Sequence, residues 1–221
     1  MSFLKSEKFD KVFEIVIAIV LGITAVLTAY ASWQASLYGG NQATKYTKGS
    51  AIVGEANAMF TEASQQLSAD MSLYNEVNDL RIDLTFAEQN NDTQEAERLS
   101  WKLDELYSNN VSDDLAAAIE WSDEQTEYAS PFEMEGLVES YYEEASALYQ
   151  EGNDMIADGQ KDNSLGDKLG LTTVIYAVVL FMLGVVNTFD GKGTRLAVAG
   201  VSFVALMYAF ITMLSVPMLT L

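Results

Sequence analysis

Four carboxylates recur at helical spacing late in the charged part of the chain. They are Glu151, Asp154, Asp158 and Asp162, within the stretch EGNDMIADGQKD. Residues three or four apart lie on one face of an α-helix, and an acidic face concentrates cations from solution. These four side chains are therefore a candidate cation vestibule beside a membrane pathway. The alternative is an ordinary solvated helix face, which is the commoner role of an acidic stripe.

Two further groups flank the first apolar run of the sequence. Glu14 stands one residue before the uncharged run, and a ring of such glutamates would form a cation-selective inner mouth. At the membrane surface the same carboxylate would simply reach water. The other end of the run carries aromatic and amide side chains, which are typical either of an aromatic belt or of a pore mouth or headgroup site. The members of this candidate outer interface are Trp33, Gln34, Tyr38, Asn41 and Gln42.

Two short motifs could accept a glycan. Asn91-Asp92-Thr93 and Asn110-Val111-Ser112 both match N-x-[ST], the acceptor pattern for N-glycosylation. Asn91 and Asn110 are therefore candidate glycosylation sites. The alternative is helix capping, since these residue types also bond to nearby backbone groups.

Much familiar site chemistry is excluded by residue types. The chain has no cysteine and no histidine, which removes disulfides, thiolate and imidazole catalysis, and the usual zinc, haem or iron–sulfur ligands. The carboxylates do not follow the spacing of a calcium loop, and no phosphate-binding glycine loop or hydrolase motif is present. We predict a non-enzymatic protein with no catalytic residue, metal site or cofactor.

The elements that position these residues include three uncharged runs. Residues 15–44, 169–189 and 196–221 contain no Asp, Glu, Lys or Arg. Each has enough apolar sequence to cross a hydrocarbon core of about 30 Å, which takes about 20 helical residues. The first run also holds Ala29-Tyr30-Ala31, which matches a signal-peptidase site, but the acidic leader and the uncharged stretch beyond it favour a membrane span. We predict an all-α integral membrane protein with three transmembrane helices.

Loop cations predict the orientation. Lys5, Lys8 and Lys11 precede the first span, and Lys192 and Arg195 lie between the second and third; such residues are retained on the cytoplasmic side. We therefore predict a multi-pass protein of the cytoplasmic (inner) membrane whose N-terminus lies on the cytoplasmic side. The expected order is a cytoplasmic N-terminus (1–12), transmembrane helix (13–38), acidic extracytoplasmic domain (39–168), transmembrane helix (169–189), cytoplasmic loop (190–195), transmembrane helix (196–218) and extracytoplasmic C-terminus (219–221).

Residues 41–168 contain 28 acidic and 7 basic side chains, a charge that repels nucleic acid. Apolar residues three or four apart from Ile52 to Leu84 predict a long helix with one buried stripe. Asp92, Ser112 and the box Ser130-Pro131-Phe132-Glu133 predict three later helix starts, and an interruption is expected at Asn163-Ser164-Leu165-Gly166. The domain is predicted to be a helical, coiled-coil-like bundle.

Two blocks resemble a known group. The segment YASWQASLYGGNQATKY, residues 30–46, resembles the A-W-x-x-x-x-W-x-G-x-Q-A-x-x-Y pattern that closes the first span in a group of uncharacterised prokaryotic membrane proteins. The segment LTTVIYAVVLFMLGVVNTFDGKGTRLAVAG, residues 171–200, is similar to the paired final spans of that group. The resemblance implies a three-span protein with a helical external domain, and it implies no activity.

Two functions are compatible with these features. One is a homo-oligomer that forms a cation-permeable pathway beneath an acidic external vestibule. The alternative is a membrane-anchored surface scaffold or sensor whose ectodomain binds a partner protein, an envelope polymer or a cation. The expected partners are the lipid bilayer, further copies of the chain and inorganic cations, with no nucleic acid.

Overall fold

The computed structural model describes residues 7–220, with side chains from Phe9 onward. Residues 1–6 of the predicted cytoplasmic N-terminus, Lys5 among them, and Leu221 of the predicted C-terminus lie outside the described residues; so does the Lys8 side chain. The chain is all-helical, at 88% helix and without strands in the part described. The elements are α1 (Glu7–Gln89), α2 (Thr93–Asn109), α3 (Asp113–Asp123), the 3₁₀ turn η2 (Pro131–Glu133), α4 (Leu137–Val185), the 3₁₀ turn η3 (Val186–Thr188) and α5 (Lys192–Leu214).

The chain divides into two compact units. The span unit consists of Met1–Gly49 and Asp154–Leu221, and the acidic unit of Ser50–Asn153. Helices α1 and α4 contribute to both. Three helices are long and apolar enough to cross a membrane, within Phe9–Gln89, Leu137–Thr188 and Lys192–Leu214. This finding confirms that the chain has three helices able to cross a membrane by length and composition, and it supports a multi-pass membrane protein; the predicted bounds of the spans stay a prediction.

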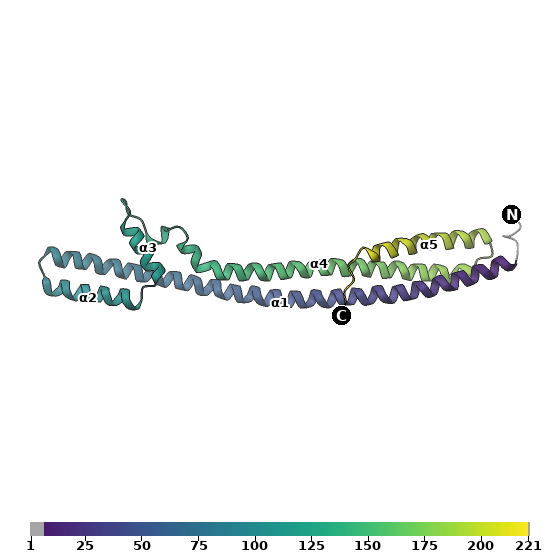
Figure 1. The fold of residues 1–221 in the computed structure, drawn as a ribbon, viewed down its shortest axis with the longest axis horizontal. Coiled ribbons are helices and arrows are strands. Elements are labelled where there is room, and N and C mark those ends of the chain that lie inside the picture. The colour runs from purple at the N-terminus through teal and green to yellow at the C-terminus, as the bar shows by residue number, and fades with distance from the viewer. Residues whose placement is uncertain (1–6, 221) are drawn as a thin grey trace. The chain divides into compact units, whose positions relative to one another are not determined.

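In the span unit, α5 lies beside the last part of α4 and the first part of α1 (Figure 1). Their shared core is apolar, with Tyr176, Val179 and Val186 fully buried on α4 and Ala209 fully buried on α5. Apolar side chains also cover the outside of the bundle, including Val26, Phe181 and Val204, which are 69%, 70% and 69% exposed. An apolar exterior of this kind suits contact with lipid.

A short connection, residues 189–191, joins α4 to α5 at what we term the loop end of the bundle. Arg195 closes it by donating from Nε to the Phe189 carbonyl at 2.7 Å and from Nη2 to the Asn187 carbonyl at 3.2 Å. These carbonyls belong to the last helical turn, where cationic donors are favoured. Lys192 Nζ lies 2.7 Å from Asp10 Oδ2 and ties the loop end to α1.

In the acidic unit, Arg81 connects three helices. From α1 it pairs with Asp123 at the end of α3, at 3.0 Å, and donates from Nη2 to the Tyr107 hydroxyl of α2 at 2.8 Å. In the same unit, α3 buries Leu115, Ala118 and Ile119 almost completely. One guanidinium with several fixed donors can serve such divergent partners.

A buried carboxylate joins α1 to α4 within the same unit. Asp70 is 4% exposed. Its Oδ2 accepts a hydrogen bond from the Tyr141 hydroxyl at 2.5 Å, and its Oδ1 accepts one from Gln66 Nε2 at 2.9 Å. Burial, followed by the hydrogen bond to Asp70, raises the pKa of Tyr141 above its ordinary value.

The start of α4 differs from the sequence prediction. Ser130 does cap a turn, accepting from the Phe132 amide at 3.4 Å, but that turn is the 3₁₀ segment Pro131–Glu133. Gly136 then takes a φ of 87° and α4 begins at Leu137. The left-handed backbone at this glycine separates the capping box from the helix. The interruption expected at Asn163-Ser164-Leu165-Gly166 is also absent, since α4 runs unbroken through these residues.

Candidate functional site

The four predicted vestibule carboxylates do not form one open acidic face. Glu151 belongs to the acidic unit and is exposed, while Asp154 and Asp158 are exposed in the span unit. Asp162 is only 9% exposed. The expectation that the whole stripe is solvated is therefore wrong for Asp162, because this residue packs against Lys45 of α1.

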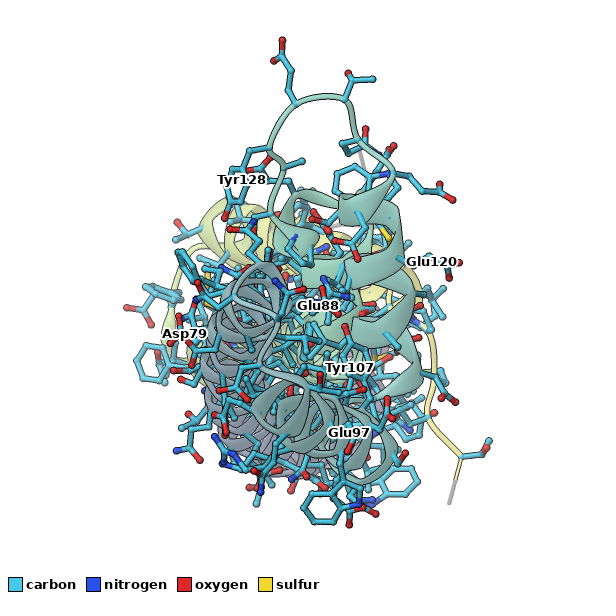
Figure 2. All side chains as sticks on the ribbon, turned by 90° about the vertical axis from the view of Figure 1, so that its left-hand side faces the viewer. Asp79, Glu88, Glu97, Tyr107, Glu120 and Tyr128 are labelled. Carbon is cyan, nitrogen blue, oxygen red and sulfur yellow. The ribbon has the colours of Figure 1, made fainter. Side chains whose placement is uncertain are left out.

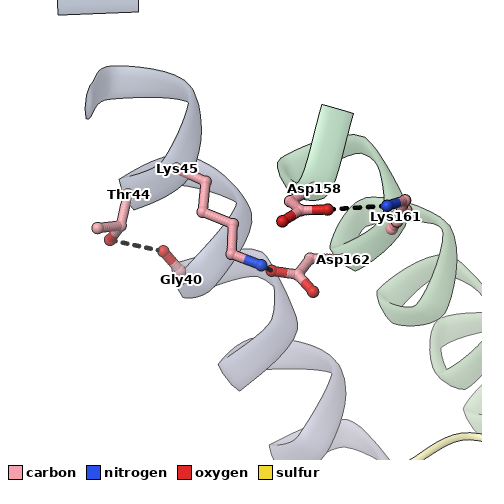
Figure 3. Close-up of polar contacts among 6 residues, drawn as sticks. All are labelled: Gly40, Thr44, Lys45, Asp158, Lys161 and Asp162. Atoms are coloured by element: carbon pink, nitrogen blue, oxygen red, sulfur yellow. Dashed lines mark hydrogen bonds and ion pairs between the residues drawn. The ribbon is translucent and has the colours of Figure 1, made fainter. Parts of the chain in front are cut away.

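Asp162 forms an ion pair with a lysine of its own chain. Its Oδ2 lies 2.7 Å from Lys45 Nζ of α1, with 13% of the Asp162 side chain and 37% of the Lys45 side chain exposed (Figure 3). The two atoms are close, yet Oδ2 receives no well-directed hydrogen bond. The contact is thus an ion pair that holds α4 against α1, and it leaves Asp162 poorly placed to attract a cation from solution.

Asp158 also has a local cation. Lys161, three residues further along α4, lies 2.8 Å from Asp158 Oδ1, as Figure 3 shows. The hydrogen bond from Lys161 lowers the pKa of Asp158 below its ordinary value. Both side chains are exposed, so this pair contributes little to stability, but it reduces the local negative potential.

The candidate outer interface is divided between two surroundings. Trp33 is 42% exposed and its ring centroid lies 5.8 Å from that of Tyr30; its exposure is compatible with the predicted aromatic belt. Asn41 is exposed and Gln42 is half-buried. Gln34 and Tyr38, by contrast, are 1% and 2% exposed inside the bundle.

Gln34 and Tyr38 bind the segment that follows α5. Gln34 Nε2 donates to the Leu219 carbonyl at 3.0 Å, and the Leu219 amide donates to Gln34 Oε1 at 2.9 Å. The Tyr38 hydroxyl donates to the Pro217 carbonyl at 2.6 Å. We call this end of the bundle the exit end. Sequence reasoning missed the role of these two residues because their partners lie 185 and 179 positions away.

Glu14 is exposed on α1, whereas Ile17, three residues further on, belongs to the bundle core. In a single copy, the carboxylate of Glu14 therefore lies on the outside of the bundle. An inner mouth formed by Glu14 would have to be built between copies of the chain.

The interior of one bundle offers no polar path for an ion among the described residues. The buried hydroxyls of Thr24, Thr172 and Ser202 each donate to the carbonyl four residues earlier in their own helix, at 2.7 to 2.8 Å. Within residues 9–220, no group of three or more acidic side chains is placed to hold a metal ion. These buried hydroxyls therefore bond to the backbone of their own helices and do not line a path for ions.

The two sequons lie at opposite ends of α2. Asn91 is exposed with a φ of 57°, and Asn110 is the exposed residue that ends α2. Asp92 and Ser112 act as the predicted caps, accepting from the amides of Glu95 and Leu115 at 3.2 Å. The capping interpretation is confirmed, and glycosylation of the exposed asparagines stays a prediction.

The acidic unit contains a cleft that the sequence did not reveal. It has a volume of about 240 Å³ between α1 and α2, and Trp101 on its wall is 64% exposed. Such exposure is unusual for a tryptophan outside binding surfaces. The lining residues are Glu76, Leu80, Trp101, Lys102, Glu105, Leu106 and Asn110.

Comparisons of this chain with models of known protein families, with curated proteins and with solved structures found no match. The resemblance based on residues 30–46 and 171–200 therefore stays a prediction.

Proposed function

We propose that this chain is a membrane-anchored surface protein whose acidic unit binds a positively charged partner. The observation that carries the proposal is the charge of that unit. It holds 24 acidic and 3 basic residues, and all of the acidic ones except Asp70 and Glu95 are exposed. Two of the basic residues, Arg81 and Arg98, are already paired with Asp123 and Glu95.

The distribution of these carboxylates favours a macromolecular partner over a single bound ion. Figure 2 shows Asp79, Glu97 and Glu120 on different sides of the acidic unit, with Tyr128 on a projecting loop. Tyr128 is 85% exposed. A surface that is negative on several sides attracts a basic protein or polymer by long-range steering, whereas a metal ion needs converging ligands.

The Trp101 cleft supplies a contact point for a basic side chain. An ammonium or guanidinium group above an indole ring gains a cation–π interaction, and Glu76 and Glu105 on the same cleft supply opposite charge. Leu80 and Leu106 would contact the apolar stem of a lysine or arginine. Lys102 also lines the cleft and is the internal competitor for these carboxylates.

The cation pathway is supported less well. Asp158 and Asp162 each hold a lysine of the same chain, and the interior of a single bundle is apolar. Conduction would therefore need a pathway between copies of the chain. Cation flux from liposomes that contain the purified protein tests this alternative, and flux that falls on substitution of Asp154 and Asp158 by Asn would favour it over an anchor.

Binding is tested on the full chain in lipid nanodiscs with a lysine-rich peptide and a neutral peptide of equal length. We expect saturable binding of the basic peptide that weakens as salt rises. The cleft variant Glu76→Gln/Glu105→Gln should bind more weakly than Glu143→Gln/Glu144→Gln, which removes the same charge from exposed positions on α4. No binding of the basic peptide at physiological salt would refute the proposal. If both variants lost the same affinity for the basic peptide, attraction by the overall negative charge would be supported and a specific role of the cleft would be rejected.

The proposed orientation is tested by labelling introduced cysteines, since the chain has none of its own. Ser146→Cys lies in the acidic unit and Thr194→Cys in the predicted cytoplasmic loop, both at exposed positions. In intact cells, a membrane-impermeant maleimide should label Ser146→Cys alone, and both should react after lysis. Labelling of Thr194→Cys in intact cells would reverse the orientation.

A further inference from the structure

The segment after α5 runs back across α1 at the exit end of the bundle. Helix α5 ends at Leu214, and Ser215 closes it through backbone bonds to the preceding turn. Val216 is 2% exposed and belongs to the bundle core. Residues 217–220 are not helical, so their backbone groups require partners outside any helix of their own.

Gln34 supplies those partners for Leu219. One side-chain amide satisfies both the amide and the carbonyl of the same residue, at 2.9 and 3.0 Å, in the manner of a neighbouring backbone strand. One turn further along α1, the Tyr38 hydroxyl donates to the Pro217 carbonyl at 2.6 Å. Pro217 has no amide hydrogen, so it leaves no donor unpaired. The sequence of the segment thus matches what Gln34 and Tyr38 offer.

These bonds have no substitute in an apolar environment. At 1% and 2% exposure, Gln34 and Tyr38 cannot turn to water without moving out of the bundle. A buried polar group that loses its partner bears its full desolvation cost. Detachment of the segment is therefore coupled to displacement of α1 side chains that cover the core, in which Ala31 is fully buried one turn before Gln34.

We propose that residues 215–220 form a strap that closes the exit end of the bundle by binding Gln34 and Tyr38, and that release of the strap admits water to the bundle core. This device is independent of the proposed partner of the acidic unit. It replaces the earlier interpretation of Gln34 and Tyr38 as a pore mouth or headgroup site. It also makes the segment after α5 the element that controls access to the interior.

A cysteine-free chain allows a direct test of core access. Ala31→Cys places a small thiol at a fully buried core position, and Thr47→Cys provides an exposed reference on the same helix, outside the predicted span. Both are reacted with a water-soluble maleimide in nanodiscs. With the strap in place, we expect Ala31→Cys to react far more slowly than Thr47→Cys. Equal rates in the otherwise unaltered chain would overturn the proposal, since the core would already be open.

Three changes then release the strap to increasing degrees. Tyr38→Phe removes one hydrogen bond, Gln34→Met removes two, and a chain ending at Ser215 removes all three. Each lost bond should raise the labelling rate of Ala31→Cys by roughly two- to tenfold. Trp33→Phe, a conservative change at the exposed neighbour of Gln34, should leave it unchanged.

The point variants keep the test decisive if the shortened chain does not fold, as circular dichroism would show. A labelling rate that rises in the order Tyr38→Phe, Gln34→Met would support the strap. Unchanged rates in both point variants would overturn it, and so would an equal rise in the Trp33→Phe control.

Discussion

Substitution of Gly159 by alanine tests the packing of α4 against α1 in the span unit. A Cβ atom at Gly159 would lie 2.8 and 2.9 Å from the Cδ1 and Cε1 atoms of Tyr46, and 3.3 Å from Lys45 Cβ. The first two distances are too short for non-bonded carbon atoms. The ring of Tyr46 or the backbone of α4 must therefore move.

Two opposing terms set the magnitude. Replacing a glycine inside a helix by alanine stabilises it by about 0.5–1 kcal/mol, whereas overpacking in a well-packed contact costs about 1–3 kcal/mol. Tyr46 is half-buried and can yield in part, which places the cost toward the lower end. We expect Gly159→Ala to be neutral or destabilising by up to about 2 kcal/mol.

Gly40→Ala is the matched control, since Gly40 lies inside α1, is exposed and has no atom within 4 Å of an added Cβ. Gly40→Ala should show only the stabilisation that comes from replacing a helical glycine by alanine. The two variants should therefore differ by about 1–3 kcal/mol in the free energy of unfolding. Thermal and denaturant unfolding in mild detergent, followed by circular dichroism, measures this. In the double variant with Tyr46→Ala, the penalty at Gly159 should disappear as a coupling energy. If Gly159→Ala stabilised the chain as much as Gly40→Ala does, the close approach would be refuted.

Two further predictions concern polar contacts. Lys45→Met leaves the Asp162 carboxylate, 13% exposed, without its cation. It should lower the free energy of unfolding by about 1–3 kcal/mol, less than the 3–5 kcal/mol of a fully buried pair. Lys161→Met, beside an exposed carboxylate, should leave the unfolding midpoint unchanged, and equal effects of the two variants would contradict the difference in burial. The raised pKa of Tyr141 means that its contribution is complete below the ordinary tyrosine pKa of 10.0 and is lost as pH rises above it. The melting temperature should therefore fall as pH rises above about 10. The fall should be smaller in Tyr141→Phe, which at neutral pH already lacks the bond to Asp70; an equal alkaline fall in both proteins would contradict this assignment.

Local signals in the sequence predicted most of the helices. The uncharged runs predicted the spans because a membrane imposes a length and a composition on each helix. Asp92 and Ser112 predicted the starts of α2 and α3, since a cap needs only an oxygen two or three residues from free amides. Both signals are contained within a few consecutive residues, so neighbouring structure does not overrule them.

Signals that depend on one glycine or on tertiary packing were less reliable. The box at Ser130 starts only a 3₁₀ turn, because Gly136 adopts a left-handed backbone before α4. The polar run from Asn163 to Gly166 stays helical against α1, where a Cβ on Gly166 would lie 3.3 Å from Tyr38 Cβ. A glycine that weakens an isolated helix is here tolerated where two helices approach closely.

The sequence predicted which acidic residues make up the candidate site, but not which partners their side chains would meet. Helical spacing placed Asp158 and Asp162 on one face, yet it could not show that Lys45, more than a hundred residues earlier, lies opposite Asp162. The same applies to the strap, whose partners on α1 lie at the other end of the sequence. Pairings between distant segments leave no periodic pattern in a single sequence.

The bonds of Arg195 have a consequence for how the chain enters the membrane. Lys192 forms an ion pair with Asp10, whereas Arg195 donates hydrogen bonds to backbone carbonyls, which do not neutralise its positive charge. Orientation during insertion depends on cations that resist translocation. Under the proposed orientation, we therefore expect the side chain that closes the α4–α5 turn also to oppose translocation of these two helices, so a neutral residue there would remove a cap and weaken the topological signal together.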